Sequence, residues 1–215
     1  MKTHLARSPI LALQLTLFLW SCGSAAPAAP SSSDSRTRRV VVLGDSLAVS
    51  PSRDQSFPAQ LNLRARSAHV AAAIANAGVS GDTTDDGLRR LDAALAGDTD
   101  IMVIELGAND GLQGVDVAAV ERNLATMIER ARARNVGVLL CGMETPPTHG
   151  FQYSIAFHGI FPRLAARYDV PLVPFLLAGV ALNPDLNTTD GIHPNAAGAS
   201  RIADTVWPYL ADMIR

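Results

Sequence analysis

The segment VVVLGDSL, residues 40–47, decides the fold class of this 215-residue chain. Its first four residues are apolar and three of them are β-branched, a pattern typical of a buried strand. Gly44, Asp45 and Ser46 follow at once, where a tight turn would expose the serine hydroxyl above the end of the strand. A helix directly after them would aim its N-terminal amides at that hydroxyl. Taken alone, however, Gly-Asp-Ser is more often a helix N-cap than a nucleophile.

Four more short apolar runs alternate with longer amphipathic stretches. The runs cover residues 70–74, 101–104, 136–141 and 172–173, and the helical patterns cover 57–67, 84–96, 117–134, 153–168 and 195–214, the last with Pro208 expected to bend it. Continuous apolar strands separated by helices predict a parallel sheet covered on both faces. We therefore expect an α/β protein, a three-layer α/β/α sandwich around a central five-stranded parallel sheet. Ligands bind outside the carboxyl ends of such strands, so the residues after each strand are candidates for a site.

Composition and charge exclude several classes of protein. About half of the chain is apolar (48%) and 18% is charged, which argues against a disordered or fibrous protein. The net charge is −2 and no basic stripe is present, so nothing favours a nucleic acid partner. Cys22 and Cys141 are the only cysteines, which argues against a disulfide framework. Cys141 ends an apolar run and is expected to be a buried structural residue.

The first residues have the pattern of an export signal. A basic start (residues 2–7) precedes an apolar run over residues 10–20 that is too short to span a bilayer comfortably. Two ways of processing stay open. Residues 19–22 resemble a bacterial lipobox, in which Cys22 would be acylated, whereas the small residues 24–26 would suit ordinary signal peptidase. We expect an exported, periplasmic protein, and a lipidated Cys22 would tether it to the membrane.

The expected organisation has three parts. Residues 1–22 form the signal peptide, residues 23–38 a flexible linker, and residues 39–215 a single domain. The linker is small, polar and proline-rich, so it has nothing to bury. No internal repeat or second domain is visible, and we expect a monomer.

Further candidate site residues follow the second and third predicted strands and occur near the C-terminus. Gly81 comes after the second strand and could turn its N–H outward as an oxyanion donor, and Asn109 after the third offers a side-chain N–H to developing negative charge. Near the C-terminus, Asp190 lies three positions before His193, where a carboxylate could fix the tautomer of the histidine. Each of these residues alone also fits a turn or a helix cap. Together with Ser46, and in one order, they favour a single hydrolytic site.

The same segments resemble the sequence blocks of the SGNH, or GDSL, hydrolase superfamily. The matching positions are Gly44-Asp45-Ser46-Leu47, Gly81, Gly107-x-Asn109-Asp110 and Asp190-x-x-His193, and the resemblance runs from about Arg39 to the C-terminus. The chain is most similar to the bacterial acyl-CoA thioesterase I, lysophospholipase and arylesterase group, over residues 103–112, 170–175 and 190–195. One departure is Ala108, where many relatives have a second glycine. The resemblance implies a flavodoxin-like SGNH hydrolase fold.

The resemblance also implies an activity and a role for each matching residue. The protein would be a serine hydrolase that cleaves carboxylic esters or thioesters, such as aryl esters, acyl-CoA or lysophospholipids. Ser46 would be the nucleophile, His193 the general base and then acid, and Asp190 its orienting partner. The backbone amides of Ser46 and Gly81 and the side chain of Asn109 would form the oxyanion hole. This chemistry needs no metal or other cofactor, and the histidines and Cys141 lack zinc-ligand spacing.

The walls of the substrate pocket are expected in two loops, residues 111–114 and 143–153. The candidate substrate contacts there are Gly111, Leu112, Pro147 and Phe151. The aromatic and proline content of the second loop suits an apolar acyl chain or an aryl group, although an ordinary surface loop would explain the same residues. His149 in that loop is expected to be a rim residue and not a second base.

Two other functions stay open at this point. A carbohydrate acetylesterase on the same scaffold would have a small, polar acyl pocket. A non-catalytic surface-binding protein could keep the fold, but the intact set of Ser46, Gly81, Asn109, Asp190 and His193 argues against it.

Overall fold

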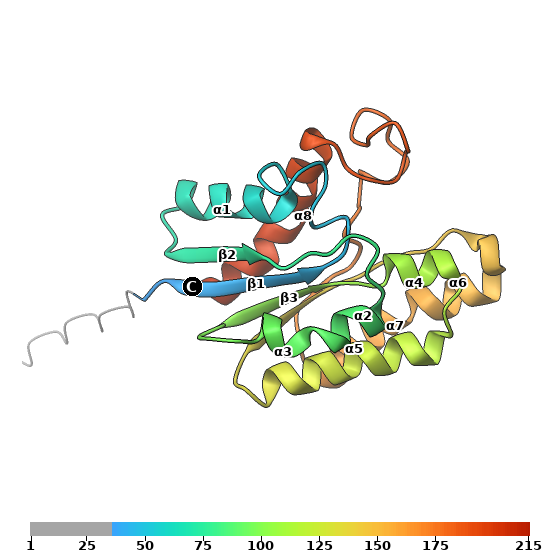
Figure 1. Cartoon of the computed structure of the whole chain (residues 1–215), viewed down its shortest axis with the longest axis horizontal. Coiled ribbons are helices and arrows are strands. Elements are labelled where there is room, and N and C mark those ends of the chain that lie inside the picture. Colours follow the sequence, from blue (N-terminus) through green and yellow to red (C-terminus); the bar gives the residue numbers. More distant parts are fainter. Residues whose placement is uncertain (1–35) are drawn as a thin grey trace, which may run out of the picture. The chain divides into compact units, whose positions relative to one another are not determined.

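The computed structural model describes residues 36–215 and contains one sheet of five parallel strands. The strands are β1 (Arg38–Gly44), β2 (Ala72–Asn76), β3 (Ile101–Glu105), β4 (Gly137–Cys141) and β5 (Leu172–Val173). They lie in the order β2-β1-β3-β4-β5 (Figure 1), the order of flavodoxin-like doubly wound sheets. The predicted fold class is therefore confirmed. The expected signal peptide, Cys22 and most of the linker lie outside the described residues.

Helices cover both faces of the sheet. On one face α1 (Phe57–Ser67) packs against α8 (Ala196–Ile214), and the other face carries α2 (Thr84–Arg89), α3 (Leu91–Ala94), α5 (Val117–Arg132) and α7 (Ile160–Tyr168) (Figure 1). The short elements α4 (Ala108–Gln113), η1 (Pro147–His149) and α6 (Phe151–His158) follow the carboxyl ends of β3 and β4. In the described part of the chain no helix combines the length and apolar character needed to cross a membrane.

The central strands form the middle of the core. All five residues of β3 are buried, as are the last five of β1, because helices cover both faces. Cys141 at the end of β4 is fully buried, as expected.

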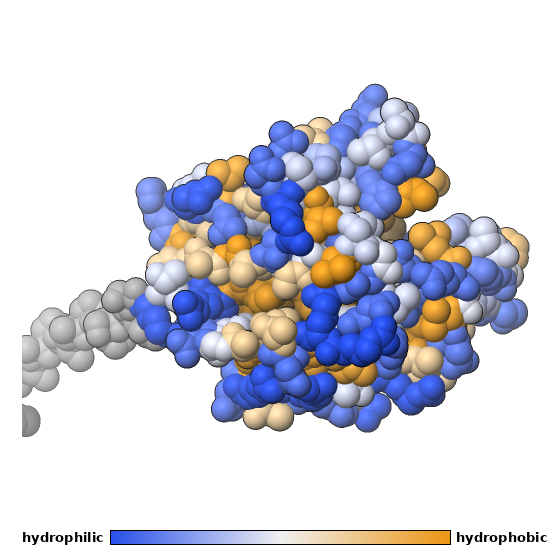
Figure 2. Space-filling model, viewed as in Figure 1, coloured by the Kyte–Doolittle hydropathy of each residue, from blue (hydrophilic) through white to orange (hydrophobic). Residues whose placement is uncertain are grey.

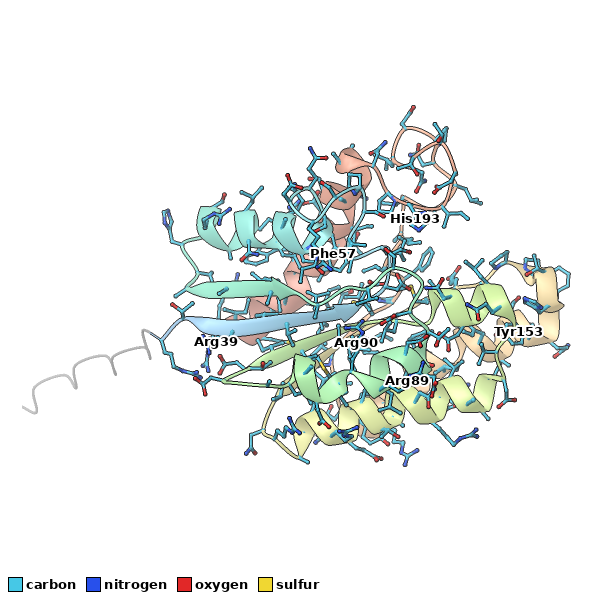
Figure 3. The ribbon with its side chains drawn as sticks, in the orientation of Figure 1. Arg39, Phe57, Arg89, Arg90, Tyr153 and His193 are labelled. Carbon is cyan, nitrogen blue, oxygen red and sulfur yellow. The ribbon has the colours of Figure 1, made fainter. Side chains whose placement is uncertain are left out.

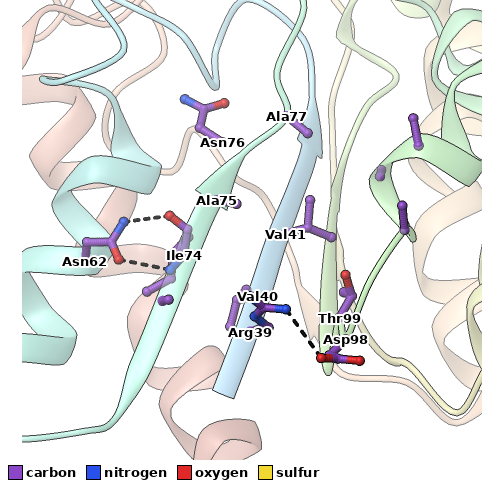
Figure 4. Close-up of a pocket in the computed structure, with 14 residues that line it drawn as sticks. Arg39, Val40, Val41, Asn62, Ile74, Ala75, Asn76, Ala77, Asp98 and Thr99 are labelled. Atoms are coloured by element: carbon purple, nitrogen blue, oxygen red, sulfur yellow. Dashed lines mark hydrogen bonds and ion pairs between the residues drawn. The ribbon is translucent and has the colours of Figure 1, made fainter. Parts of the chain in front are cut away.

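The edge strand β2 is alanine-rich, and its outer side is closed by a side chain. The amide of Asn62 in α1 accepts a hydrogen bond from the Ile74 N–H (2.9 Å) and donates one to the Ile74 carbonyl (2.7 Å) (Figure 4). The amide thus takes the place of a neighbouring strand, which protects the edge from pairing with another chain. A hollow of about 580 Å3 runs along β1 and β2 here. Two charged side chains of the described residues line it, Arg39 and Asp98, and they pair with each other (Figure 4).

Several expected element boundaries differ from the structure by a residue or two, and three elements differ more. The second strand begins at Ala72 instead of residue 70. The helix expected over 84–96 is divided into α2 and α3 at Arg90, whose guanidinium turns inward to bind backbone carbonyls. The helix expected over 153–168 begins at Phe151 and is divided at Gly159. By contrast, α8 continues through Pro208.

Both loops expected to line the substrate pocket contain helical turns. Gly107 has φ +120°, a conformation that L-residues avoid, and it lets the chain turn directly from β3 into α4. Asn109 and residues 111–113 therefore lie in a helix and not in a loop. Likewise, residues 143–153 contain η1 and the start of α6.

Candidate active site

Ser46 stands in a tight turn at the carboxyl end of β1. Its carbonyl accepts hydrogen bonds from the amides of Val49 (3.2 Å) and Ser50 (3.0 Å), and its side chain is half-buried. The next helix begins only at Phe57. Ser46 is therefore not a helix N-cap, and the expectation that a helix directly after it aims amides at its hydroxyl is wrong. The turn itself exposes the hydroxyl, because it reverses the chain just past the strand.

A chain of hydrogen bonds leads from the Ser46 hydroxyl to the C-terminal segment. Nε2 of His193 lies 2.8 Å from Oγ of Ser46, and Nδ1 lies 2.7 Å from Oδ2 of Asp190. The other oxygen of Asp190 accepts hydrogen bonds from the Thr188 hydroxyl and from the amides of Ile192 and His193. The bond from the His193 side chain, together with these, holds the pKa of the Asp190 carboxyl well below its usual range.

The expected oxyanion donors lie beside the same hydroxyl. Gly81 is exposed with φ +85°, the left-handed conformation that glycine adopts without strain. Among the described residues, the amides of Ser46 and Gly81 donate no hydrogen bond to a protein atom. The side-chain amide of Asn109 donates to the Asp82 carbonyl (2.9 Å) and lies 3.2 Å from Oδ2 of Asp45. The side-chain nitrogen of Asn109 thus already has two protein acceptors, so an oxyanion would have to share or replace one of them.

One cavity of about 620 Å3 brings these groups together at the carboxyl end of the sheet. The residues lining it are Ser46, Ser50, Pro51, Ser80, Gly81, Asn109, Thr188, Asp190 and His193. All five residues predicted for the triad and the oxyanion hole are among them. Figure 3 shows His193 in the segment ahead of α8, beyond the carboxyl end of β1. Apart from Pro51, no apolar side chain of the described residues lines this cavity.

The four predicted substrate contacts lie elsewhere. Gly111 is buried, and its carbonyl accepts a hydrogen bond from the Thr145 hydroxyl (2.9 Å). Leu112, Pro147 and Phe151 are exposed, and none of the four lines the cavity at Ser46. His149 is also exposed, and its Nε2 lies 3.0 Å from the Leu112 carbonyl, which suits the rim position expected for it.

A buried pair of carboxyl groups supports the turn from below, and the sequence analysis missed it. Glu105, the last residue of β3, is fully buried, and its Oε2 accepts a hydrogen bond from the Asp45 amide (3.1 Å). Burial raises the pKa of Asp45 to about 7, opposed by the hydrogen bond from the Leu47 amide and by His193. Burial and the neighbouring Asp45 raise the pKa of Glu105. The available signal was a glutamate directly after four apolar strand residues, where burial of a charged group costs free energy unless the group is paired and hydrogen-bonded.

Arg90 is the second residue that sequence analysis missed. Its guanidinium donates to the carbonyls of Gly44 (2.8 Å) and Ala77 and pairs with the Asp82 carboxylate. It thereby joins the strand that leads to Ser46 with the segment on both sides of Gly81. Figure 3 labels it beside Arg89, which pairs with surface aspartates of its own helix. Nothing in the Arg-Arg dipeptide distinguishes the two, because the difference lies in which side chain faces the sheet.

The described residues hold no cluster of three His, Cys, Asp or Glu side chains that could bind a metal ion. The arrangement instead offers a hydroxyl, a base that contacts it and nearby N–H donors. Such a set can perform nucleophilic acyl transfer.

Comparison with known proteins gives consistent similarities. The model of the GDSL-like lipase/acylhydrolase family matches residues 42–201. Esterase TesA of Pseudomonas aeruginosa is 39% identical over 178 residues, covering 81% of this chain and 89% of the relative. Thioesterase 1/protease 1/lysophospholipase L1 of Escherichia coli K12 is 37% identical over 178 residues, covering 81% and 84%. A crystal structure of TesA superposes with a TM-score of 0.77 at 38% identity, covering 82% of this chain and 99% of that one.

Proposed function

The chain belongs to the GDSL-like lipase/acylhydrolase family and is a hydrolase, and we propose that it cleaves carboxylic esters and thioesters through an acyl-enzyme on Ser46. The observation that carries this proposal is the pair of hydrogen bonds from Ser46 to His193 (2.8 Å) and from His193 to Asp190 (2.7 Å). A hydroxyl, an imidazole and a carboxylate in this order are the parts of a serine hydrolase triad.

In the proposed reaction, Nε2 of His193 takes the proton of the Ser46 hydroxyl as Oγ attacks the acyl carbon. The amides of Ser46 and Gly81 and the side chain of Asn109 stabilise the negative oxygen, and His193 returns the proton to the leaving group. Water then attacks the acyl-enzyme with His193 as base, and the acid leaves. Asp190 holds the imidazole in the tautomer that presents a free Nε2 and stabilises the imidazolium that forms.

The proposed substrates are small esters and thioesters with an apolar acyl or aryl part, such as aryl esters, acyl-CoA and lysophospholipids. Two relatives carry esterase, thioesterase and lysophospholipase in their names, which supports this class. The names and not the cavity lining support it, because among the described residues the lining is polar apart from Pro51, as a carbohydrate acetylesterase would also require.

A fluorophosphonate probe and a series of p-nitrophenyl esters test the proposal. The probe should label the wild type and not Ser46→Ala. Ester hydrolysis by Ser46→Ala should fall to background, a loss on the order of a millionfold. Ser50→Ala is the matched control, since Ser50 lines the same cavity and should remain dispensable. Persistent labelling of Ser46→Ala would contradict the assignment. Across esters from acetate to palmitate we expect cleavage beyond acetate, and cleavage of acetate alone would favour a carbohydrate acetylesterase.

We also propose that the protein is exported and tethered through a lipidated Cys22, on the sequence pattern of residues 2–22. Palmitate labelling that disappears in Cys22→Ser would support the tether. Equal palmitate labelling of the wild type and Cys22→Ser would contradict the proposed tether.

A further inference from the structure

Exposed apolar side chains gather at one end of the fold. In the described residues, seven large hydrophobic side chains are exposed, by 43% to 90%. Six of them belong to segments that follow the carboxyl ends of strands: Val79 after β2, Leu112 in α4, Phe151 and Ile155 in α6, and Leu182 and Ile192 after β5. The seventh, Leu63, lies in the middle of α1. We call the six residues the apolar rim.

The apolar rim lies at the same end of the fold as the polar cavity, and two of its residues adjoin the cavity wall in sequence. Val79 directly precedes Ser80 and Gly81 of the cavity wall, and Ile192 directly precedes His193. Among residues 36–215, the cavity itself offers an acyl chain no apolar side chain except Pro51. Apolar contact at this end of the molecule therefore lies outside the cavity. Figure 2 shows separate hydrophobic areas among polar ones at the carboxyl end of the sheet, at the right of the view.

The layout and charge of this end favour a lipid surface over a protein partner. The six side chains come from segments after four different strands, and not from one continuous helix face. A fluid lipid surface can accommodate such separate apolar side chains. Burial of each side chain stabilises binding by about 25 cal/mol per Å2 of apolar surface removed from water. These segments, together with the segment after β1, carry more exposed carboxylates than guanidinium groups. The carboxylates are Asp54, Asp116, Glu144, Asp185 and Asp190, and the one guanidinium is that of Arg53. This excess of negative charge would repel an anionic surface and leave an uncharged or zwitterionic one as the fitting partner.

We propose that the apolar rim seats the mouth of the cavity on an uncharged or zwitterionic lipid–water surface, so that esters held in a micelle or bilayer reach Ser46 from that surface. The rim side chains enter the apolar layer, and the acyl chain keeps apolar contact while its ester group enters the polar cavity. The catalytic consequence rests on the proposed function, whereas the binding of the rim to the surface does not.

Tryptophan reporters test the binding. In the full chain carrying Ser46→Ala, Ile155→Trp should show a blue shift of its emission on addition of phosphatidylcholine vesicles, relative to the parent chain. Leu63→Trp, an exposed control outside the rim, should show none. Equal shifts at both positions, or no shift at Ile155→Trp, would overturn the proposal. A shift seen only with phosphatidylglycerol vesicles would overturn its charge argument.

Catalysis gives the second test. We expect Ile155→Ser with Leu182→Ser to lower the hydrolysis of one ester about tenfold above its critical micelle concentration and to leave the rate below it unchanged. Leu63→Ser should change neither rate. An equal loss of rate below and above that concentration would contradict the proposal. It would mean that the two residues bind individual substrate molecules or stabilise the fold. Self-association of the wild type that is lost in the double variant would assign the rim to a second copy.

If Ser46→Ala still hydrolyses esters, the proposed function fails while the vesicle result stands by itself.

Discussion

Asp45 and Asp190 both belong to the hydrogen-bonded groups around Ser46, yet their surroundings are opposite. Asp45 is fully buried beneath the turn, and burial raises its pKa to about 7. Asp190 lies in an exposed segment, where hydrogen bonds from His193, Ile192 and Thr188 lower its pKa. The contrast shows that loss of hydration controls the first carboxyl and local donors control the second.

The two sides of the site are also built differently. Asp45, Glu105 and Asn109 come from distant parts of the chain and are joined by hydrogen bonds, and Arg90 binds the carbonyl of Gly44 next to them. The segment from Thr188 to His193 is held by hydrogen bonds between residues two or three positions apart. The buried side therefore depends on the whole fold, whereas the exposed side depends mainly on its own sequence.

Of the two sides, the exposed one gives the larger expected effect. Asp190→Asn removes the carboxylate proposed to orient His193, and we expect kcat to fall roughly ten-thousandfold while the protein remains folded. The measurement is steady-state hydrolysis of a p-nitrophenyl ester, with thermal unfolding as a check of folding. Asp185→Asn, in the same exposed segment, should retain activity. A loss of less than about tenfold in Asp190→Asn would mean that another group orients His193.

The next effect comes from the buried side. Asn109→Ala removes one of the N–H donors proposed for the oxyanion and should lower kcat about a hundred- to thousandfold, with little change in KM. Asn62→Ala is the control, because it removes an amide that binds the edge of β2 outside the cavity. A change in KM alone would place Asn109 in ground-state binding and contradict the proposed role.

The smallest effect concerns stability and its dependence on pH. The pKa of Asp45 rises from 3.8 to about 7 on folding, so the folded state holds more protons than the unfolded state between these values. The contribution of Asp45 to the free energy of unfolding therefore decreases as pH rises through this window, by about 2 kcal/mol between pH 5 and pH 7. Asp45→Asn removes this contribution, so its stability should decrease less over the same range.

Urea unfolding at pH 5 and pH 7 checks this prediction. The comparison is the change in the free energy of unfolding between the two pH values, wild type against variant. A parallel pH dependence in the two proteins would mean that Asp45 is not the titrating group.

The fold was predictable where the pattern is local and strong. The run 40–43 is continuously apolar because β1 is buried on both faces, and the residues of the exposed segment with Asp190 and His193 follow one another in sequence. Helix α4 was missed because Asn-Asp-Gly is typical of a turn, and only Gly107 at φ +120° lets a helix start there. The substrate contacts were placed by composition, which does not say which residues face the cavity.

The sequence by itself determined that five parallel strands alternate with helices, the family, and the residues proposed for nucleophile, base and orienting acid. Those features depend on periodicity and on short motifs. Only the tertiary structure decided that Arg90 and not Arg89 binds the end of the strand that leads to Ser46, that Asp45 and Glu105 are buried together, and that six exposed apolar side chains lie at the same end of the fold as the polar cavity. Burial and hydrogen bonding between residues far apart in the chain exist only after the strands have paired, and these contacts set the pKa values and the neighbours of each group.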